Sequence, residues 1–152
     1  MERYAPFLSR YRIDPGSEPG APWRDPALVD RLGYLELAAA FAGVTFNGGL
    51  YRIHDAASAE EAQAYVSASF PGVNVRVCGH SWLGIEFAVG LDDHDGNQTM
   101  VVLNAETREV TPFVADLVTF HDRILLQVPE LLDETLFDEW LAADPDRPTL
   151  RP

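Results

Sequence analysis

The chain has 152 residues, 47 % of them hydrophobic, and a formal net charge of −13. That length and composition fit a single folded domain with a substantial core. The acidic charge disfavours nucleic acid and anionic lipid as partners. No apolar run approaches the roughly 18 residues needed to span a bilayer, and a single cysteine allows no disulfide framework.

The N-terminal residues lack the basic and apolar regions of a secretory signal, so we expect a cytoplasmic protein. We expect residues 1–152 to form one domain, because no linker or repeat interrupts the chain. Prolines and glycines predict an irregular N-terminal arm over 1–24. A second cluster of prolines and aspartates predicts a frayed tail over 142–152.

Two helices are predicted in the first third of the chain. Apolar residues at helical spacing between Tyr4 and Tyr11 predict a short helix inside the arm. Asp25 followed by Pro26 predicts the start of a second helix, and Gly43 predicts its end.

A pair of glycines, Gly48 and Gly49, lies within the sequence FNGGLYRIH (46–54). Glycine-rich phosphate loops lead from a strand into the amino end of a helix. Here a predicted helix comes first and strand-forming residues follow. We therefore interpret the glycines as a tight turn with positive φ, and we expect a strand over 50–54.

The middle of the chain changes from helical to strand periodicity. Ser58–Glu61 has the pattern of a capping box and predicts a helix that ends before Pro71. Apolar residues then alternate with polar ones over 73–77 and over 85–89, which predicts two half-buried strands.

The apolar run 100–103 predicts a central strand that is covered on both faces. Glu109–Phe113 predicts a strand that is ending or lies at an edge, because Pro112 cannot donate a ladder hydrogen bond. Apolar stripes over 117–128 and 136–141 predict two terminal helices. Short links between the central strands indicate antiparallel pairing. We therefore predict an α+β domain with a central antiparallel sheet of about four to six strands flanked by helices.

Catalytic and metal-binding patterns are weak. The four histidines, His54, His80, His94 and His121, show no pairing at metal-site spacing, and we predict neither a metal nor a cofactor. Cys78 and His80 would share one face of a strand, which leaves a nucleophilic Cys–His pair as an alternative. A buried, unreactive cysteine is the more common arrangement, so we predict no catalytic residues.

The most polar segment is 91–97, which contains Asp92, Asp93 and Asp95. Its oxygen-bearing side chains could bind calcium, but position 103 is Leu where an EF-hand loop beginning at Asp92 would need a glutamate. Aspartate, glycine and asparagine are also typical of hairpin turns. We therefore expect an exposed acidic loop that is available to a partner.

Glu86 and Trp82 each have two interpretations. Glu86 projects opposite the apolar residues of its strand, so it faces solvent or, beneath a helix, requires a buried partner such as Arg52 or Arg76. Trp82 lies between glycines in a predicted loop, where it is either a plug of the core or an anchor for a partner. We favour the plug.

Several motifs together resemble a known family. They are FNGGLYRIH, a helix ending at Phe70–Pro71, GHSWLGIEFAV, VVLNAETREV, DLVTFHDRIL and LFDEWL. Their order over about 41–141 resembles the C-terminal domain of type VI secretion immunity proteins, which is similar to the SUKH superfamily of bacterial immunity proteins. The chain keeps the family's Trp82-Leu83-Gly84, but it has Ser81 where aspartate is frequent and Ile85 where arginine is frequent.

The resemblance implies a toxin-neutralising module with a SUKH-like fold and no enzymatic activity, which binds a cognate protein toxin, often a nuclease. A basic toxin would be attracted by the acidic surface. The oligomeric state is left open. The predicted partner-contact residues are Trp82, Glu86, Asp92, Asp93, Asp95, Asp133, Glu134, Asp138 and Glu139.

Two competing hypotheses remain open from the sequence. The first is a regulatory ligand- or protein-binding module of the same fold, which the gene neighbourhood would distinguish from an immunity protein. The second is a small hydrolase that uses Cys78 and His80. It predicts a thiol pKa well below the usual value and rapid alkylation at neutral pH.

Overall fold

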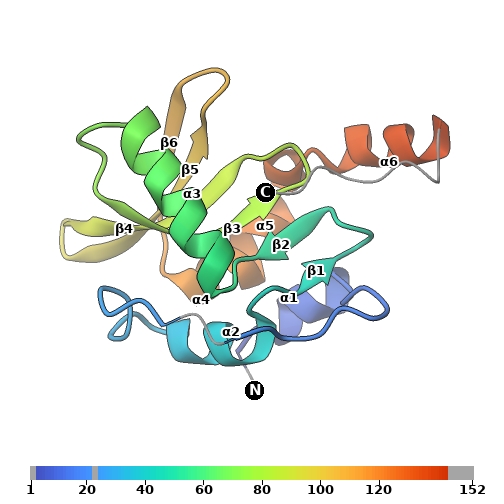
Figure 1. The fold of residues 1–152 in the computed structure, drawn as a ribbon, viewed down its shortest axis with the longest axis horizontal. Helices are drawn as coiled ribbons and strands as arrows, with labels where there is room; N and C mark the ends of the chain where they lie inside the picture. The colour runs from blue at the N-terminus through green and yellow to red at the C-terminus, as the bar shows by residue number, and fades with distance from the viewer. Residues whose placement is uncertain (1–2, 22–23, 144–152) are drawn as a thin grey trace.

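The computed structural model describes residues 3–21 and 24–143. The elements in chain order are α1 (Ala5–Arg10), α2 (Tyr34–Phe41), β1 (Thr45–Phe46), β2 (Tyr51–Ile53), α3 (Ala56–Ser69), β3 (Val75–Ser81), β4 (Glu86–His94), β5 (Asn97–Asn104), β6 (Glu109–Val114), α4 (Leu117–Thr119), the π-helix η1 (Phe120–Ile124), α5 (Leu125–Gln127), the 3-10 helix η2 (Pro129–Leu132) and α6 (Glu134–Ala143). Figure 1 shows their arrangement.

A six-stranded antiparallel sheet forms the centre of the molecule, with the strands in sequence order from β1 to β6 (Figure 1). Short links connect the consecutive strands, except that the link from β2 to β3 contains helix α3 (Ala56–Ser69). The predicted α+β class and the predicted number of strands are confirmed. Of the described residues, no helix has the length and apolar composition needed to cross a membrane.

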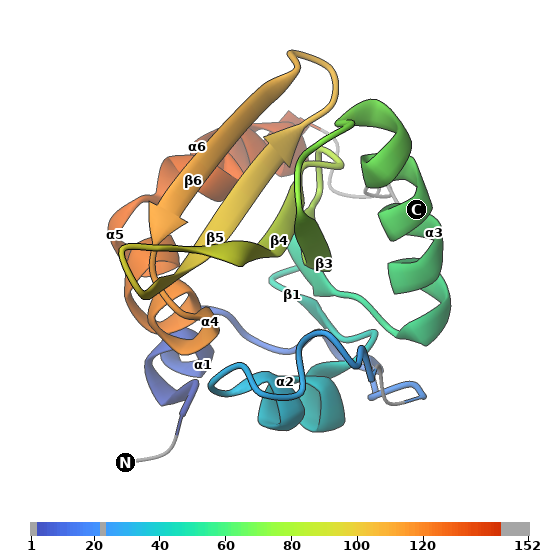
Figure 2. The same ribbon diagram turned by 90° about the vertical axis from the view of Figure 1, so that its left-hand side faces the viewer.

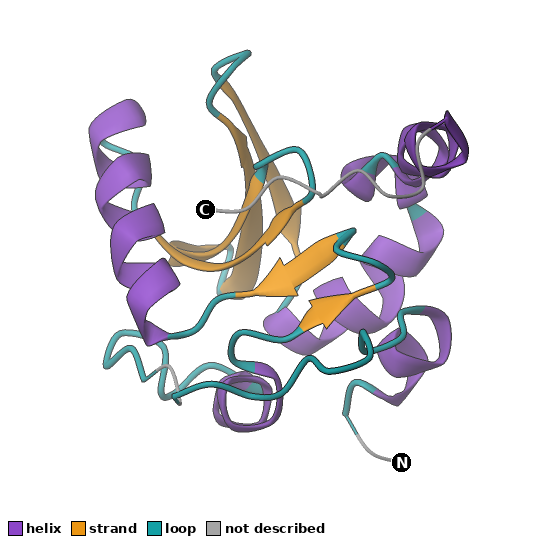
Figure 3. Ribbon diagram, turned by 45° about the vertical axis from the view of Figure 1, so that its right-hand side comes forward, coloured by secondary structure: helices purple, strands orange, loops and turns teal. Residues whose placement is uncertain are grey.

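Helices cover the two faces of the sheet unequally. Helices α4 and α5 lie on one side and α3 lies on the other (Figure 2), and Figure 3 shows the sheet between these two groups of helices. On the α4 side, Phe87 of β4 and Phe113 of β6 contact the ring of Phe120. On the other side, α3 packs chiefly against β3.

The predicted tight turn in FNGGLYRIH is present and leads into a strand, as predicted, but it follows the short strand β1, which was not predicted, and so connects β1 to β2 as a hairpin. Gly48 and Gly49 have φ values of 73° and 92°, which L side chains rarely adopt. Their N–H groups donate to the carboxylate of Asp14, at 2.5 and 3.0 Å. A carboxylate of the N-terminal arm therefore accepts hydrogen bonds from both glycine N–H groups of this turn.

The predicted N-terminal arm packs tightly against the core. The predicted short helix is present as α1, and Tyr4, Phe7 and Tyr11 are buried. The carboxylate of Asp122 in η1 accepts hydrogen bonds from the N–H groups of Tyr4 and Phe7. Prolines and glycines make residues 12–21 irregular, but they do not detach the arm.

The second helix begins later than predicted. Residues 25–33 form successive turns, and α2 starts at Tyr34. Gly33 has a φ of 79°, which interrupts a right-handed helix. Asp25 is not the N-cap of a helix that begins at Pro26; its Oδ1 instead accepts a hydrogen bond from the Ala27 N–H, at 3.0 Å.

The capping box of α3 is displaced by one turn from its predicted position. Asp55, not Ser58, is the N-cap, and Ser58 occupies the third helical position. The Asp55 side chain accepts from the Ser58 N–H at 2.9 Å, and the Ser58 hydroxyl accepts from the Asp55 N–H at 3.1 Å. Serine here makes the reciprocal bond that glutamate usually makes, so the prediction of Ser58 as the N-cap is wrong. The helix ends before Pro71, as predicted.

The central strands are more buried than their alternating sequence predicts. Every residue of β4 from Glu86 to Gly90 is buried, and so is most of β3. The prediction of a half-buried strand is therefore wrong for 86–89, which is buried on both faces, whereas alternating burial is confirmed at 75–77, where Arg76 is partly exposed between two buried valines. The apolar run 100–103 is buried in β5, which pairs on both sides, as predicted, although part of its α3-side face lines a groove. Strand β6 lies at the edge, which is one of the two positions predicted for it.

The last third of the chain is helical, as predicted. Residues 117–127 form a nearly continuous helix with a π segment in its centre. Helix α6 extends away from the body of the molecule (Figure 1). Most of the predicted tail, residues 144–152, lies outside the described residues.

Candidate partner-binding surface

A groove lies on the part of the α3-side sheet face that α3 leaves uncovered. It has a volume of about 590 Å³. Apolar residues from β3, β5 and β6 and the segment before β3 form much of it. The lining residues are Gly72, Val73, Asn74, Val75, Gly90, Asp92, Asp93, His94, Thr99, Val101, Val110, Pro112 and Val114.

The uncovered area of this groove belongs mainly to the edge strand. Val110 and Val114 are 40 % and 59 % exposed, whereas Val101 in the neighbouring strand is 7 % exposed. Pro112 lies between the two exposed valines, and side chains two apart in a strand share a face. Exposed apolar side chains that lie together on one face are typical of contact surfaces.

The predicted acidic loop is the tip of the β4–β5 hairpin, at one end of the groove. Asp92 accepts a hydrogen bond from Asn74 at 3.2 Å. Asp93 forms an ion pair with Arg31 at 3.0 Å, and 45 % of its side chain is exposed. Asp95 occupies the turn with a φ of 50°, and its side chain is 88 % exposed. The hairpin therefore presents carboxylates to solvent.

The predicted C-terminal acidic residues form a separate patch. Asp138 and Glu139 are exposed on α6, and Asp133 precedes that helix. Glu134 is mostly occupied by intramolecular contacts, because it accepts hydrogen bonds from Arg10 and from the hydroxyl of Tyr11, each at 2.8 Å.

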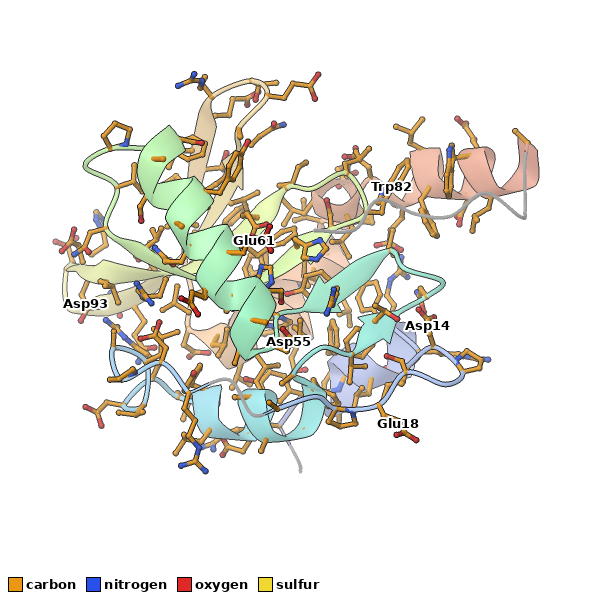
Figure 4. The ribbon with its side chains drawn as sticks, in the orientation of Figure 1. Asp14, Glu18, Asp55, Glu61, Trp82 and Asp93 are labelled. Carbon is orange, nitrogen blue, oxygen red and sulfur yellow. The ribbon has the colours of Figure 1, made fainter. Side chains whose placement is uncertain are left out.

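The two acidic patches are far apart. In Figure 1 the β4–β5 hairpin and α6 lie at opposite ends of the molecule, and Asp93 and Trp82 mark the same separation in Figure 4. A single small partner segment therefore cannot contact both patches, and each needs its own test.

Trp82 is a plug of the core, which confirms the favoured interpretation, and its prediction as a partner contact is corrected. It is 5 % exposed, and its ring contacts the rings of Phe137 and Trp140 in α6. Its Nε1–H donates to the carbonyl of Leu132, at 3.0 Å. The indole thus attaches the C-terminal helix to the turn between β3 and β4.

Glu86 is also buried, and its prediction as a surface contact is corrected. It is 9 % exposed, and its Oε1 accepts a hydrogen bond from His54 Nε2 at 2.8 Å. The other ring nitrogen, His54 Nδ1, lies 3.0 Å from the hydroxyl of Ser58 in α3. Its partner is therefore a histidine, and neither Arg52 nor Arg76 fills that role. Arg76 is instead paired with Asp25.

His80 and Arg52 extend this polar network across the sheet. Arg52, His80 and Glu86 are cross-strand neighbours on β2, β3 and β4, so their side chains share a face. The His54 and His80 rings are 5.1 Å apart. Of the described residues, Arg52 and His80 each contain a buried nitrogen, Nε and Nε2 respectively, with no hydrogen-bond partner.

This network was not predicted as a unit from the sequence. Its signal was the polar residues Arg52 and His54 two apart in a strand, with polar Glu86 inside an otherwise apolar segment. That pattern indicates one polar sheet face. It does not indicate whether the face is covered, which depends on the packing of α3.

The hypothesis of a hydrolase that uses Cys78 and His80 predicts a thiol with a lowered pKa, and the structure contradicts that prediction. Cys78 is fully buried, and its Sγ–H donates to the Phe87 carbonyl at 3.2 Å. Burial, with a smaller contribution from the Glu86 charge, raises the pKa of the thiol well above its usual value. A reactive cysteine requires the opposite shift.

The acidic hairpin does not form a cluster of metal ligands. Within residues 3–21 and 24–143, no group of three or more His, Cys, Asp and Glu side chains is placed to hold a metal ion. The calcium alternative for 92–97 therefore gains no support from the geometry. The positive φ values of Asp95 and Gly96, 50° and 80°, are those of a hairpin turn.

Comparisons of the chain with protein-family models, with curated proteins and with solved structures found no match. The interpretation of this surface therefore depends on its geometry and chemistry.

Proposed function

We propose that this chain is a non-enzymatic bacterial immunity protein that binds and neutralises a cognate secreted toxin. The observation that carries the proposal is the position of the acidic β4–β5 hairpin beside an apolar groove on an uncovered sheet face. Apolar surface supplies binding free energy, and a charged border supplies orientation and specificity. The resemblance of the motifs to type VI secretion immunity proteins supplies the biological role.

The charge of the chain supports a basic partner. A formal net charge of −13 increases the rate at which a positively charged protein encounters this one. A nuclease that binds nucleic acid is commonly basic, because it contacts phosphates. The negative charge of this chain would therefore attract such a toxin, whereas it would repel nucleic acid.

The direct test pairs this chain with any secreted protein that is encoded beside it. The pair is coexpressed and purified, and killing of a sensitive strain is measured with and without this protein. We expect a stable complex, protection from killing, and an affinity that falls as salt is added, because salt screens surface charges. Unchanged killing by that toxin in the presence of this protein overturns the proposal.

Two charge variants identify the face involved. The triple variant Asp92→Asn/Asp93→Asn/Asp95→Asn removes the hairpin charges, and Asp138→Asn/Glu139→Gln removes exposed charges from α6. We expect the first to weaken the complex by about 3- to 10-fold or more and the second by less than about 2-fold. The reverse order assigns the contact to α6 and overturns the role of the hairpin. A neighbouring regulator in place of a toxin favours the regulatory module.

A further inference from the structure

The groove has a chemical character that restricts what it can bind. Its floor and edge contain five aliphatic side chains and one proline, which are Val73, Val75, Val101, Val110, Val114 and Pro112. Aliphatic side chains gain free energy when contact with other apolar groups removes them from water. The occupant must therefore offer apolar side chains.

The charged border has a single sign. Among the residues that line the groove, the formally charged side chains are Asp92 and Asp93. Arg31 partly neutralises Asp93 from outside the groove, while the partner of Asp92 is the uncharged amide of Asn74. A net negative potential thus remains at the hairpin end, and it favours a cationic group.

The exposed edge strand is poorly suited to extending the sheet. Pro112 lies in the middle of β6 and has no N–H to donate. Proline in an edge strand is a common means of preventing another strand from pairing with it. Binding is therefore expected through side chains on the face of the sheet, and not through backbone pairing along β6.

We propose that the groove binds a partner segment in which aliphatic side chains lie on the valine floor and an arginine or lysine reaches the Asp92–Asp93 end. Charge complementarity selects this occupant over an acidic or neutral apolar segment. The inference rests on the proposed function, since the segment would belong to the toxin. It goes further by naming the chemistry of the contacted segment and the residues that recognise it.

The test uses capped octapeptides as probes and the full chain labelled with ¹⁵N. One peptide alternates valine and arginine, a second alternates valine and glutamate, and a third alternates serine and arginine. Each is titrated to about 1 mM at low salt, a range that detects the weak affinity expected of a short segment. Amide chemical-shift changes then locate the binding site.

We expect the valine–arginine peptide to bind, with the largest shifts at Asn74, Asp92, Thr99 and Val114. Equal binding by the valine–glutamate peptide contradicts the role of charge. Equal binding by the serine–arginine peptide contradicts the role of the apolar floor. Absence of binding by the valine–arginine peptide, or shifts centred on α6, overturns the proposal as a whole.

Matched variants test the same residues. The double variant Val110→Ser/Val114→Ser makes the edge of the groove less apolar. We expect it to lower the affinity for the valine–arginine peptide about 5-fold or more. Asp92→Asn/Asp93→Asn is expected to weaken it about 2- to 5-fold and to reduce its salt dependence. The controls are Val29→Ser, which is 41 % exposed outside the groove, and Asp138→Asn. Both are expected to leave the affinity within about 2-fold.

The same variants separate this inference from the proposed function. If Val110→Ser/Val114→Ser still protects cells from the toxin with unchanged affinity, the protein neutralises the toxin through another surface and the groove inference is wrong. If the peptide binds in the groove as expected but no neighbouring toxin is neutralised, the proposed function is wrong and the groove serves a different basic partner.

Discussion

His54 Nε2 lies 2.8 Å from Glu86 Oε1, and both side chains are buried on the α3 side of the sheet. The contact joins the end of β2 to the beginning of β4, and Ser58 continues it into α3. This buried hydrogen bond joins two residues that are 32 positions apart in the sequence. A buried polar group that loses its partner is costly, so this contact gives the first prediction.

Replacing Glu86 by alanine removes the acceptor and leaves His54 buried without it. We expect the free energy of unfolding to fall by about 1–3 kcal/mol. Glu86→Gln keeps an acceptor oxygen and is expected to cost less. The measurement is urea unfolding at neutral pH.

Glu61→Gln is the control for the Glu86 variants. Glu61 is exposed on the outer surface of α3 (Figure 4), and its replacement should change stability by less than about 0.5 kcal/mol. If Glu86→Ala changes stability as little as Glu61→Gln, the network does not contribute to folding.

His121 is expected to make the protein less stable in mild acid. It is fully buried, and burial lowers its pKa from 6.5 to about 4. Its Nδ1–H donates to the Leu117 carbonyl, and its Nε2 accepts from the Tyr51 hydroxyl, each at 2.8 Å. Both bonds use the neutral ring, so protonation opposes the folded state.

The direction of the pH dependence follows from this shift. Because the pKa of His121 is depressed by folding, the unfolded chain binds more protons between pH 6.5 and 4. The contribution of neutral His121 to the free energy of unfolding is therefore fully present above pH 6.5. It declines as the pH falls from 6.5 to 4 and does not decline further below pH 4. Burial also lowers the pKa of His80 to about 4, so it acts in the same direction.

The variant His121→Gln isolates this contribution, because glutamine can retain both hydrogen bonds without titrating in this range. Between about pH 7 and pH 4.5, we expect the wild type to lose roughly 2–3 kcal/mol more stability than the variant. Denaturant unfolding at several pH values measures the difference. Parallel curves for the two proteins contradict the prediction.

Trp82 is expected to control the attachment of α6. Trp82→Phe keeps an aromatic ring but loses the donor to the Leu132 carbonyl, and the smaller ring reduces contact with Phe137 and Trp140. We expect faster amide exchange throughout 134–143, with little change in α3. Replacing the neighbouring Leu83, which is 38 % exposed, by alanine serves as the control. Equal exchange in α6 for both variants refutes the role of Trp82.

Gly33 is expected to tolerate no side chain. A Cβ at this position would lie 2.3 Å from Val118 Cγ2 and 2.6 Å from the Tyr4 hydroxyl oxygen, and the φ of 79° is unfavourable for L residues. Gly72 has a similar φ of 87° but nothing within 4 Å of an added Cβ. It is therefore a matched control for backbone strain without a steric clash.

We expect Gly72→Ala to lower the free energy of unfolding by about 1–2 kcal/mol, the cost of the left-handed conformation alone. Gly33→Ala should cost about 1–3 kcal/mol more, because it adds overpacking. Thermal or urea unfolding gives both values. Equal destabilisation by the two substitutions means that Tyr4 and Val118 move aside without cost.

Cys78 is expected to be unreactive in the folded protein. It is fully buried, and burial raises the pKa of its thiol. A thiol reagent at mildly alkaline pH should modify the native protein about a hundredfold or more slowly than the unfolded chain, since access requires opening of the structure. Rapid modification of native protein would restore the hydrolase hypothesis.

Local sequence patterns determined much of the fold. Strand periodicity and short links predicted the antiparallel sheet, Gly48 and Gly49 predicted the tight turn before β2, and Pro112 predicted a strand that ends or lies at an edge. These predictions succeeded because each depends on backbone conformations that a few adjacent residues set by themselves. The late start of α2 also has a local cause, because the positive φ of Gly33, 79°, interrupts the predicted helix in its middle.

Tertiary packing alone decided which side chains are available to a partner. Glu86 has the alternating position of a solvent-facing residue, yet α3 covers it and His54 pairs with it. Trp82 has the loop context of an interface anchor, yet α6 packs over it. The valine groove exists because α3 leaves β5 and β6 uncovered at one end. A strand's sequence encodes which residues share a face, but the element that covers that face is supplied by a distant part of the chain.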